Sequence, residues 1–154
     1  MRVAVGFDHG GYPMRDVVLE AVRAAGHEPI DLGAYVYEQD DDYPDFSLKV
    51  GRAVVNGDAE RGIIACGSGV GACIAANKIP GVYACVAHDY YSAGQGVEHD
   101  NMNVLCLGPR VIGPETARTL ILAFLGAKFS AEPRHHRRVG KIHQIEAEAL
   151  QGGK

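Results

Sequence analysis

The sequence predicts an α/β fold, a three-layer αβα sandwich around a Rossmann-like, five-stranded parallel sheet. Apolar segments followed by turn residues and then by helical periodicity recur along the chain, which is typical of βαβ units. The apolar segment 61–66 is unbroken, as in a central strand covered on both faces. A length of 154 residues suits one domain. No repeat or linker divides the chain, so residues 1–154 are expected to form a single domain.

The five strands are expected at residues 2–7, 28–32, 61–66, 83–87 and 103–107. The first helix follows from apolar residues at helical spacing between Met14 and Ala25, and it ends at Gly26. Further helices are expected at 44–55, 72–78 and 90–97 and from Pro114 onward. Gly94 and Gly96 weaken the helix at 90–97. The polar segment 39–45 is expected to be a loop with solvated acids.

A last helix is expected over 133–150, with an interruption at Gly140. Val139, Ile142 and either Ile145 or Glu146 fall on one side of it. Such a small apolar surface favours docking on a partner subunit over packing on the chain's own core.

Charge and hydropathy exclude several classes of protein. The net charge is −4, and residues 133–154 carry +3 while residues 1–132 carry −7, which argues against general nucleic-acid binding but permits a local anion site. No apolar run approaches the roughly 18 residues that a membrane span needs. The first residues show no signal-peptide pattern, so a cytoplasmic location is expected. The four cysteines include no CxxC pair and are interpreted as free thiols.

A glycine loop at residues 67–71, Gly-Ser-Gly-Val-Gly, links the central strand to the next helix. Backbone N–H groups of such a loop bind an anion at the start of a helix. Its G-x-G-x-G spacing differs from the dinucleotide motif G-x-G-x-x-G, which disfavours nucleotide binding. A tight turn without any ligand is the simpler alternative.

Cys66 ends the same strand, directly before this loop. A thiol that faces a helix N-terminus ionises more readily, and a thiolate acts as a base or a nucleophile. The alternative is a buried structural cysteine.

Four motifs occur in order: GFDHGGY at 6–12, DYPD at 42–45, CGSGVG at 66–71 followed by IAANK at 74–78, and EHDNMNVLCLG at 98–108. Over residues 2 to about 147 the chain resembles ribose-5-phosphate isomerase type B and its galactose- and allose-6-phosphate relatives. The resemblance implies an isomerase of phosphorylated aldoses and ketoses that uses no metal and no organic cofactor. It also implies a homodimer or a dimer of dimers with shared active sites.

The same resemblance assigns the catalytic residues. Cys66 is the base that moves a proton between C1 and C2 through an enediolate, and Ser68 stabilises that intermediate together with the amides of Gly67, Gly69 and Gly71. One branch of the family has a glutamate base at the position of Ala72, so this chain falls in the cysteine branch. His99 is the ring-opening residue, a role that suits imidazole near neutral pH.

Residues that bind the substrate are implied as well. Asp8 and His9 contact the sugar and its phosphate end, and Tyr43 lies on the substrate side. The phosphate ligands are Arg110, Arg134 and Arg138, because guanidinium groups form paired hydrogen bonds with phosphate. Without the resemblance, the basic residues of the tail would be interpreted as a solvated face. No metal is expected at His135, His136 and His143, which lack a carboxylate or cysteine at ligand spacing.

Asp100 departs from the family pattern, which commonly has asparagine after the histidine. An ionised carboxylate only accepts hydrogen bonds; it can still bind sugar hydroxyls, and beside His99 it favours the imidazolium form. The expected reaction is the interconversion of ribose 5-phosphate and ribulose 5-phosphate, a step of the pentose phosphate pathway. The alternatives are an isomerase of allose 6-phosphate, galactose 6-phosphate or a phosphotetrose, and a non-catalytic nucleotide-binding module of the universal stress kind.

Overall fold

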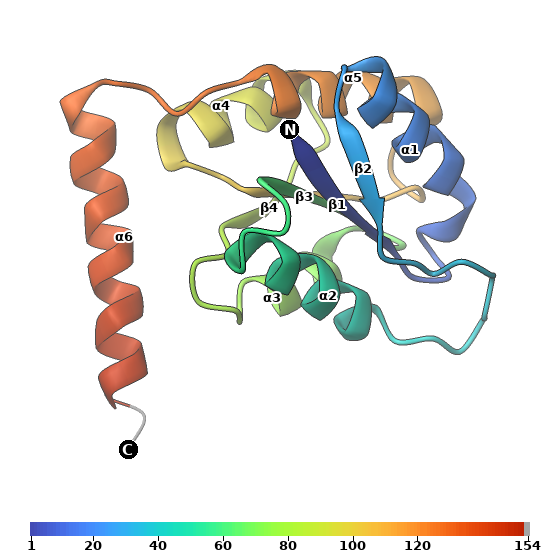
Figure 1. The fold of residues 1–154 in the computed structure, drawn as a ribbon, viewed down its shortest axis with the longest axis horizontal. Coiled ribbons are helices and arrows are strands. Elements are labelled where there is room, and N and C mark those ends of the chain that lie inside the picture. Colours follow the sequence, from blue (N-terminus) through green and yellow to red (C-terminus); the bar gives the residue numbers. More distant parts are fainter. Residues whose placement is uncertain (153–154) are drawn as a thin grey trace.

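A five-stranded, all-parallel sheet forms the centre of the protein in a computed structural model that describes residues 1–152 (Figure 1). The strands lie side by side in the order β2-β1-β3-β5-β4. Their bounds are β1 Arg2–Phe7, β2 Glu28–Asp31, β3 Arg61–Ala65, β4 Ala84–Val86 and β5 Val104–Leu107. The prediction of a five-stranded parallel α/β fold is therefore confirmed.

Helices cover both faces of the sheet. The helices α1 (Arg15–Ala24), α4 (Tyr90–Asp100) and α5 (Pro114–Gly126) pack on one face, where Phe7, Leu105 and Phe124 are fully buried. The helices α2 (Tyr43–Val55) and α3 (Val70–Ala76) cover the other face, over Ile64 and Val104. Figure 1 shows these two layers above and below the strands.

The strand order places a crevice in the middle of the sheet. The chain passes from β1 outward to β2 and then returns to pair β3 with the other edge of β1. Parallel sheets bind ligands at such a reversal, beyond the carboxyl ends of the strands. The loops that follow β1 and β3 meet at this point.

The helices α4 and α6 differ most from the sequence prediction, and α2 begins at Tyr43, inside the segment 39–45 that was expected to be a loop. The helix α4 continues through Asp100, whereas an end at residue 97 is expected from its glycines. Gly96 allows Met102 to pack against the helix, because a Cβ there would lie 3.2 Å from the Met102 sulfur. The helix then ends at Asn101, which adopts a left-handed conformation with φ of 55°. As a result, His99 and Asp100 lie on the last turn of the helix.

The last helix, α6 (Pro133–Gly152), continues through Gly140 and is not interrupted there. Helix formation at Gly140 costs only about 1 kcal/mol relative to alanine, which neighbouring turns offset. The helix stands at one side of the molecule (Figure 1). Val139 is buried, but Ile142, Ile145 and Leu150 remain exposed.

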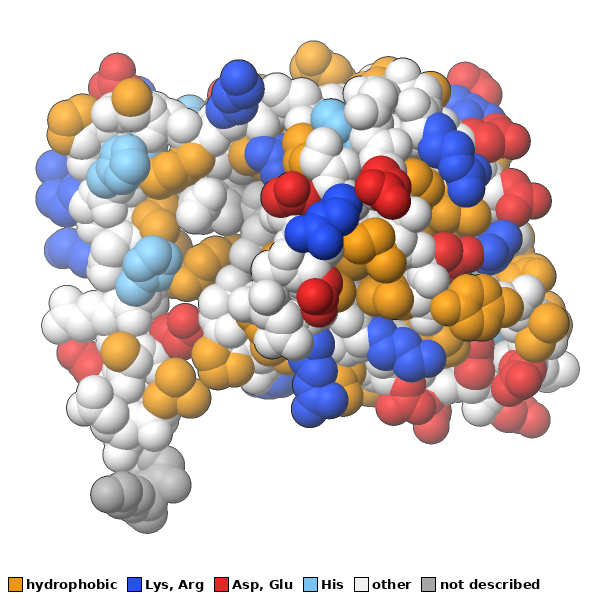
Figure 2. Space-filling model, in the orientation of Figure 1, with side chains coloured by type: hydrophobic (Ala, Val, Ile, Leu, Met, Phe, Trp, Pro, Cys, Tyr) orange, Lys and Arg blue, Asp and Glu red, His pale blue; other side chains and the backbone are white. Residues whose placement is uncertain are grey.

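Basic side chains follow one edge of α6. Figure 2 shows Lys and Arg along the outer border of this helix, and hydrophobic side chains where it approaches the rest of the chain. None of the helices within residues 1–152 combines the length and the apolar character needed to cross a membrane.

Candidate active site

A cleft of about 270 Å³ opens at the carboxyl ends of β1 and β3. The residues that line it come from the loops after β1, β3 and β5 and from the start of α2. They are Asp8, His9, Gly10, Tyr43, Cys66, Gly67, Ser68, Gly71 and Arg110. Residues far apart in the sequence that were assigned to one site thus share one cleft.

The Cys66 thiol lies at the bottom of this cleft and is 5% exposed. Its Sγ accepts a hydrogen bond from the backbone N–H of Gly69 at 3.2 Å. Gly69 has φ of 83°, a left-handed conformation that glycine adopts without strain and that turns its N–H back toward the sulfur. A hydrogen bond from an amide stabilises negative charge on sulfur.

Ser68 lies beside the thiol in the same loop. Its hydroxyl oxygen accepts from the N–H of Val70 at 3.3 Å. The helix α3 begins at Val70, two residues earlier than expected, so Gly71 belongs to its first turn. Ser68 Oγ can still donate its own proton to an oxygen in the cleft.

The loop after β1 and the loop after β3 approach each other closely at glycines, which have no side chains. A Cβ on Gly11 would lie 1.8 Å from the carbonyl oxygen of Ala65, and a Cβ on Gly10 would lie 2.7 Å from the Gly67 nitrogen. A Cβ on Gly71 would meet the Tyr43 ring at 2.8 Å. Glycine is therefore required at positions 10, 11 and 71, because a side chain there would clash with these neighbours.

Arg110 supplies a cation to the cleft. Its backbone N–H donates to the carbonyl of Gly67 at 3.1 Å. The guanidinium lies over the same glycine, because a Cβ there would be 3.3 Å from the Arg110 Cζ. It forms no salt bridge with any residue of the chain up to 152, so its charge is available to an anion.

His9 is held by a carboxylate that the sequence analysis placed among solvated acids. Asp41 Oδ1 accepts from the backbone N–H of His9 at 2.8 Å and lies 2.8 Å from its Nδ1. The Asp41 side chain is only 8% exposed, so the prediction that it is solvated is wrong. The contact joins residues 32 positions apart in the sequence. Asp41 lies in a polar loop that has no periodicity, so no signal in the sequence identifies its contact with His9.

The pKa of His9 is raised, chiefly by the hydrogen bond to Asp41, while desolvation opposes this shift. A raised pKa means that the imidazolium persists to higher pH than in an unpaired histidine. His9 therefore offers the cleft a cationic side chain over a wider pH range than an unpaired histidine would.

Asp8 is 4% exposed and supports the loop after β1. Its Oδ1 accepts from the N–H of Gly11 at 2.7 Å. Burial raises the pKa of Asp8, and the hydrogen bond from Gly11 opposes that effect.

Ligand atoms of Asp8, His9 and Asp41 lie within 4.8 Å of one another, a spacing that a metal ion would accept. The existing hydrogen bonds already engage the imidazole Nδ1 and two of the carboxylate oxygens. The second carboxylate oxygen of Asp41, Oδ2, is buried and has no hydrogen-bond partner in the part of the chain that the structure describes.

Asp41→Asn is expected to lower the pKa of His9, because an amide cannot offer the negative charge that stabilises the imidazolium. The midpoint of the His9 titration, followed by NMR of its ring C–H signals, should shift to lower pH. Asp40→Asn is the matched control, since Asp40 is exposed and the carboxylate bonded to His9 is that of Asp41. An unchanged midpoint in the Asp41 variant would contradict this account of the loop.

Five predicted site residues do not line this cleft: Gly69, which contacts it through its hydrogen bond to the Cys66 sulfur, and four residues on other elements. His99 and Asp100 are on the last turn of α4, and Arg134 and Arg138 are exposed on α6. The His99 ring stacks on His135 with centroids 4.1 Å apart. The single chain thus forms two separate groups, one around Cys66 and one where α4 meets α6.

Comparison with known proteins identifies the relatives of this chain. The Ribose/Galactose Isomerase family matches residues 3–142. YwlF of Bacillus subtilis (strain 168), whose name assigns it provisionally as a sugar phosphate isomerase, is 40% identical over 150 residues, covering 97% of this chain and 100% of YwlF.

Solved structures give the same result. Ribose-5-phosphate isomerase B of Clostridium thermocellum is similar with a TM-score of 0.92 and 42% identity, over 97% of this chain and 99% of that one. Ribose-5-phosphate isomerase B of Mycoplasma genitalium, solved with bound ribulose-5-phosphate, has a TM-score of 0.89 and 36% identity, over 96% and 97% of the two chains.

Proposed function

Because the chain belongs to the ribose/galactose isomerase family, we propose that it interconverts ribose 5-phosphate and ribulose 5-phosphate with Cys66 as the base. The observation that carries this proposal is the Cys66 thiol at the bottom of a cleft that also contains Arg110 and His9. A sulfur that receives an amide hydrogen bond is suited to accept a proton from carbon, and the cations are suited to hold a phosphate.

In the proposed reaction, the Cys66 thiolate removes the proton from C2 of the open-chain aldose. The electrons form an enediolate, the hydroxyl proton moves from the oxygen on C2 to the oxygen on C1, and Cys66 returns the carbon-bound proton, or one taken up from solvent, to C1 to give the ketose. Ser68 Oγ and the N–H groups of Gly67 and Gly71 stabilise the charge on the enediolate oxygens as it develops. Gly69 acts differently, since its N–H is engaged with the thiol.

The remaining residues of the proposed site come from a second copy of the chain. His99 opens the sugar ring, Asp100 lies beside it, and Arg134 and Arg138 bind the phosphate. None of these four residues lines the cleft around Cys66, and the apolar residues Ile142 and Ile145 of α6 are exposed; both observations support a homodimer with shared sites. The i, i+4 spacing of the two arginines directs both to one face of the helix.

A turnover assay across a panel of sugar phosphates tests the substrate. We expect kcat/KM for ribose 5-phosphate to exceed that for allose 6-phosphate or galactose 6-phosphate by about 10- to 200-fold, the range that one additional carbon provides. The reverse order would make the enzyme a phosphohexose isomerase. Binding of ATP without turnover of any sugar phosphate would instead favour a nucleotide-binding module.

Mixing two inactive variants tests whether sites are shared. Cys66→Ala and His99→Asn should each be nearly inactive alone, because every site then lacks one group. A hybrid dimer contains one site with both groups intact. Random exchange of subunits makes half of the dimers hybrids, and one of the two sites in each hybrid is intact. Activity should therefore recover to about a quarter of wild type.

Differently tagged chains and native mass spectrometry establish how many hybrids form. Hybrids that remain inactive would show that Cys66 and His99 do not cooperate across two chains. Mixing Cys66→Ala with a second preparation of itself is the control and should give no recovery.

A further inference from the structure

Gln95 lies one helical turn before His99 on α4, and the two side chains are in contact. Gln95 Nε2 lies 2.9 Å from Nδ1 of His99 and 3.3 Å from Oδ2 of Asp100. An amide nitrogen carries two hydrogens and cannot accept. It therefore donates one hydrogen to the Asp100 carboxylate and one to Nδ1 of His99, which must be the acceptor.

We propose that Gln95 is a positioning residue that holds His99 in the tautomer with its proton on Nε2. Asp100 fixes the direction of the Gln95 amide, because a rotated amide would place its oxygen against the carboxylate. Two acceptors would then face each other without a hydrogen between them. The inference rests on the proposed role of His99 in ring opening and specifies how that role is prepared.

The His99 ring is also fixed in its plane. His135 of α6 stacks on it with an interplanar angle of 28°, and His135 is itself 2% exposed. Burial lowers the pKa of His135, and the charges of His99, Arg134 and Arg138 lower it further while Glu132 opposes them. A neutral ring is therefore the stacking partner near neutral pH. Stacking on His135 fixes the plane of the ring but not the 180° flip about the Cβ–Cγ bond, which exchanges Nδ1 with Cδ2, and the contact with Gln95 selects between these two orientations.

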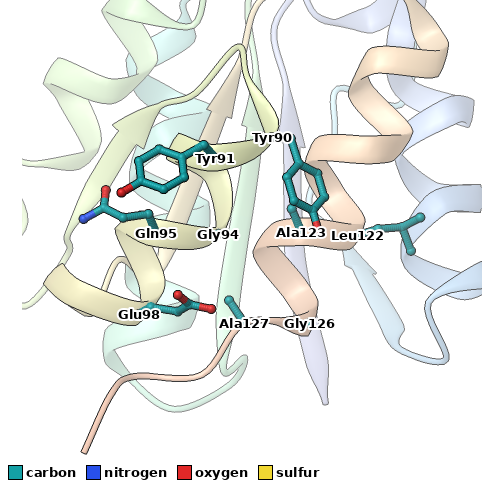
Figure 3. A pocket seen from close by; sticks show the side chains of 9 residues that line it. All are labelled: Tyr90, Tyr91, Gly94, Gln95, Glu98, Leu122, Ala123, Gly126 and Ala127. Atoms are coloured by element: carbon teal, nitrogen blue, oxygen red, sulfur yellow. The ribbon is translucent and has the colours of Figure 1, made fainter. Parts of the chain in front are cut away.

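Nε2 of His99 forms no hydrogen bond with residues 1–152, so its N–H is available to the substrate. An N–H at this atom is a donor and suits the ring oxygen of a closed sugar, which only accepts. Figure 3 shows Gln95 on α4 with its amide directed away from α5. The amide therefore does not point toward α5 across the cavity of about 380 Å³ between these two helices, and it remains available to His99 and Asp100.

This arrangement gives Asp100 a purpose that differs from substrate contact. Its carboxylate is a stronger acceptor than the asparagine amide common in the family. The hydrogen bond from Gln95 to Asp100 is stronger for this reason. The aspartate at position 100 therefore acts on His99 through the amide of Gln95.

NMR of the full chain, carrying histidines labelled with ¹⁵N, measures the tautomer without any assay of activity. Two-bond correlations between ring hydrogens and ring nitrogens distinguish a protonated from a bare nitrogen, and His99→Asn assigns the signal by its disappearance. At about pH 8, where histidines are neutral, the wild type should show His99 with a bare Nδ1 and a protonated Nε2. A protonated Nδ1 would overturn the proposal.

Two substitutions shift the tautomer by different amounts. Gln95→Glu replaces the donor by an acceptor, so Nδ1 of His99 should become protonated. Gln95→Leu removes the contact, so the ratio should relax toward the mixture of an unrestrained histidine. Gln144→Leu is the matched control, because Gln144 is exposed on α6 and bonds only Glu148. An unchanged His99 signal in both Gln95 variants would overturn the proposal.

Kinetics then separate positioning from a general structural role. Conversion of ribose 5-phosphate requires ring opening, and Gln95→Glu should slow it by about tenfold, the value of one hydrogen bond. Exchange of the C1 hydrogen of ribulose 5-phosphate with heavy water starts from an open chain and should stay within about twofold. Equal losses in both would refute the assignment. A wild type that turns over no sugar phosphate would refute the proposed function but leave the NMR result intact.

Discussion

Cys66→Ala is expected to lower kcat by about 10²- to 10⁴-fold, the contribution typical of a positioned general base. Alanine removes the sulfur that receives the Gly69 hydrogen bond and leaves the backbone of the loop unchanged. The loss should be seen both in conversion of ribose 5-phosphate and in exchange of sugar C–H hydrogens with heavy water. Binding of sulfate, which needs only the cations, should persist.

Cys85→Ala is the matched control for this experiment, because Cys85 is an exposed thiol on β4 outside the cleft. It should retain full activity. If Cys66→Ala still exchanges hydrogen at the wild-type rate, the base is another group and the proposed mechanism is wrong.

Replacing both Arg134 and Arg138 by glutamine is expected to raise KM for the sugar phosphate at least about 100-fold. Each charged hydrogen bond to phosphate contributes roughly 1.5–3 kcal/mol, and 1.4 kcal/mol corresponds to a factor of ten. The effect on kcat should be smaller, because the phosphate lies away from the carbon atoms that react. Inhibition by sulfate should weaken in parallel.

Arg137→Gln tests whether any arginine of α6 would have the same effect. Arg137 is exposed on the same helix but was not among the predicted phosphate ligands. Sedimentation of each variant must show that the assembly is unchanged. If the double variant retains its KM and its sulfate inhibition, α6 does not bind the phosphate.

Most of the fold could be predicted because buried strands leave a clear pattern in the sequence. β1 lies where its apolar segment predicts, and β3 ends one residue before the predicted boundary, at Ala65. The sequence is a poor guide to helix ends where a glycine lies inside a helix. Gly96 and Gly140 both lie within helices, since local propensity is weak against packing and helical continuity.

The cleft was predicted in part, for a reason that follows from parallel sheets. Cys66 and the glycine loop follow a central strand, and all such loops meet at one edge. Asp41 was missed because its contact with His9 depends on the path of a loop between β2 and α2. Gln95 was missed because a polar residue on a helix surface gives no sign of which neighbour it contacts.

The close approach of Gly11 to the Ala65 carbonyl limits how this cleft can change in evolution. Any side chain added at Gly11 would force β1 and β3 apart. Substitutions at this position therefore cannot narrow the cleft in small steps. The rim is different, because Tyr43 and Arg110 reach the opening with side chains that can be exchanged without disturbing the sheet. New preferences for longer or shorter sugars should therefore arise at the rim, and libraries aimed at altered selectivity should vary Tyr43 while they keep Arg110 for the phosphate.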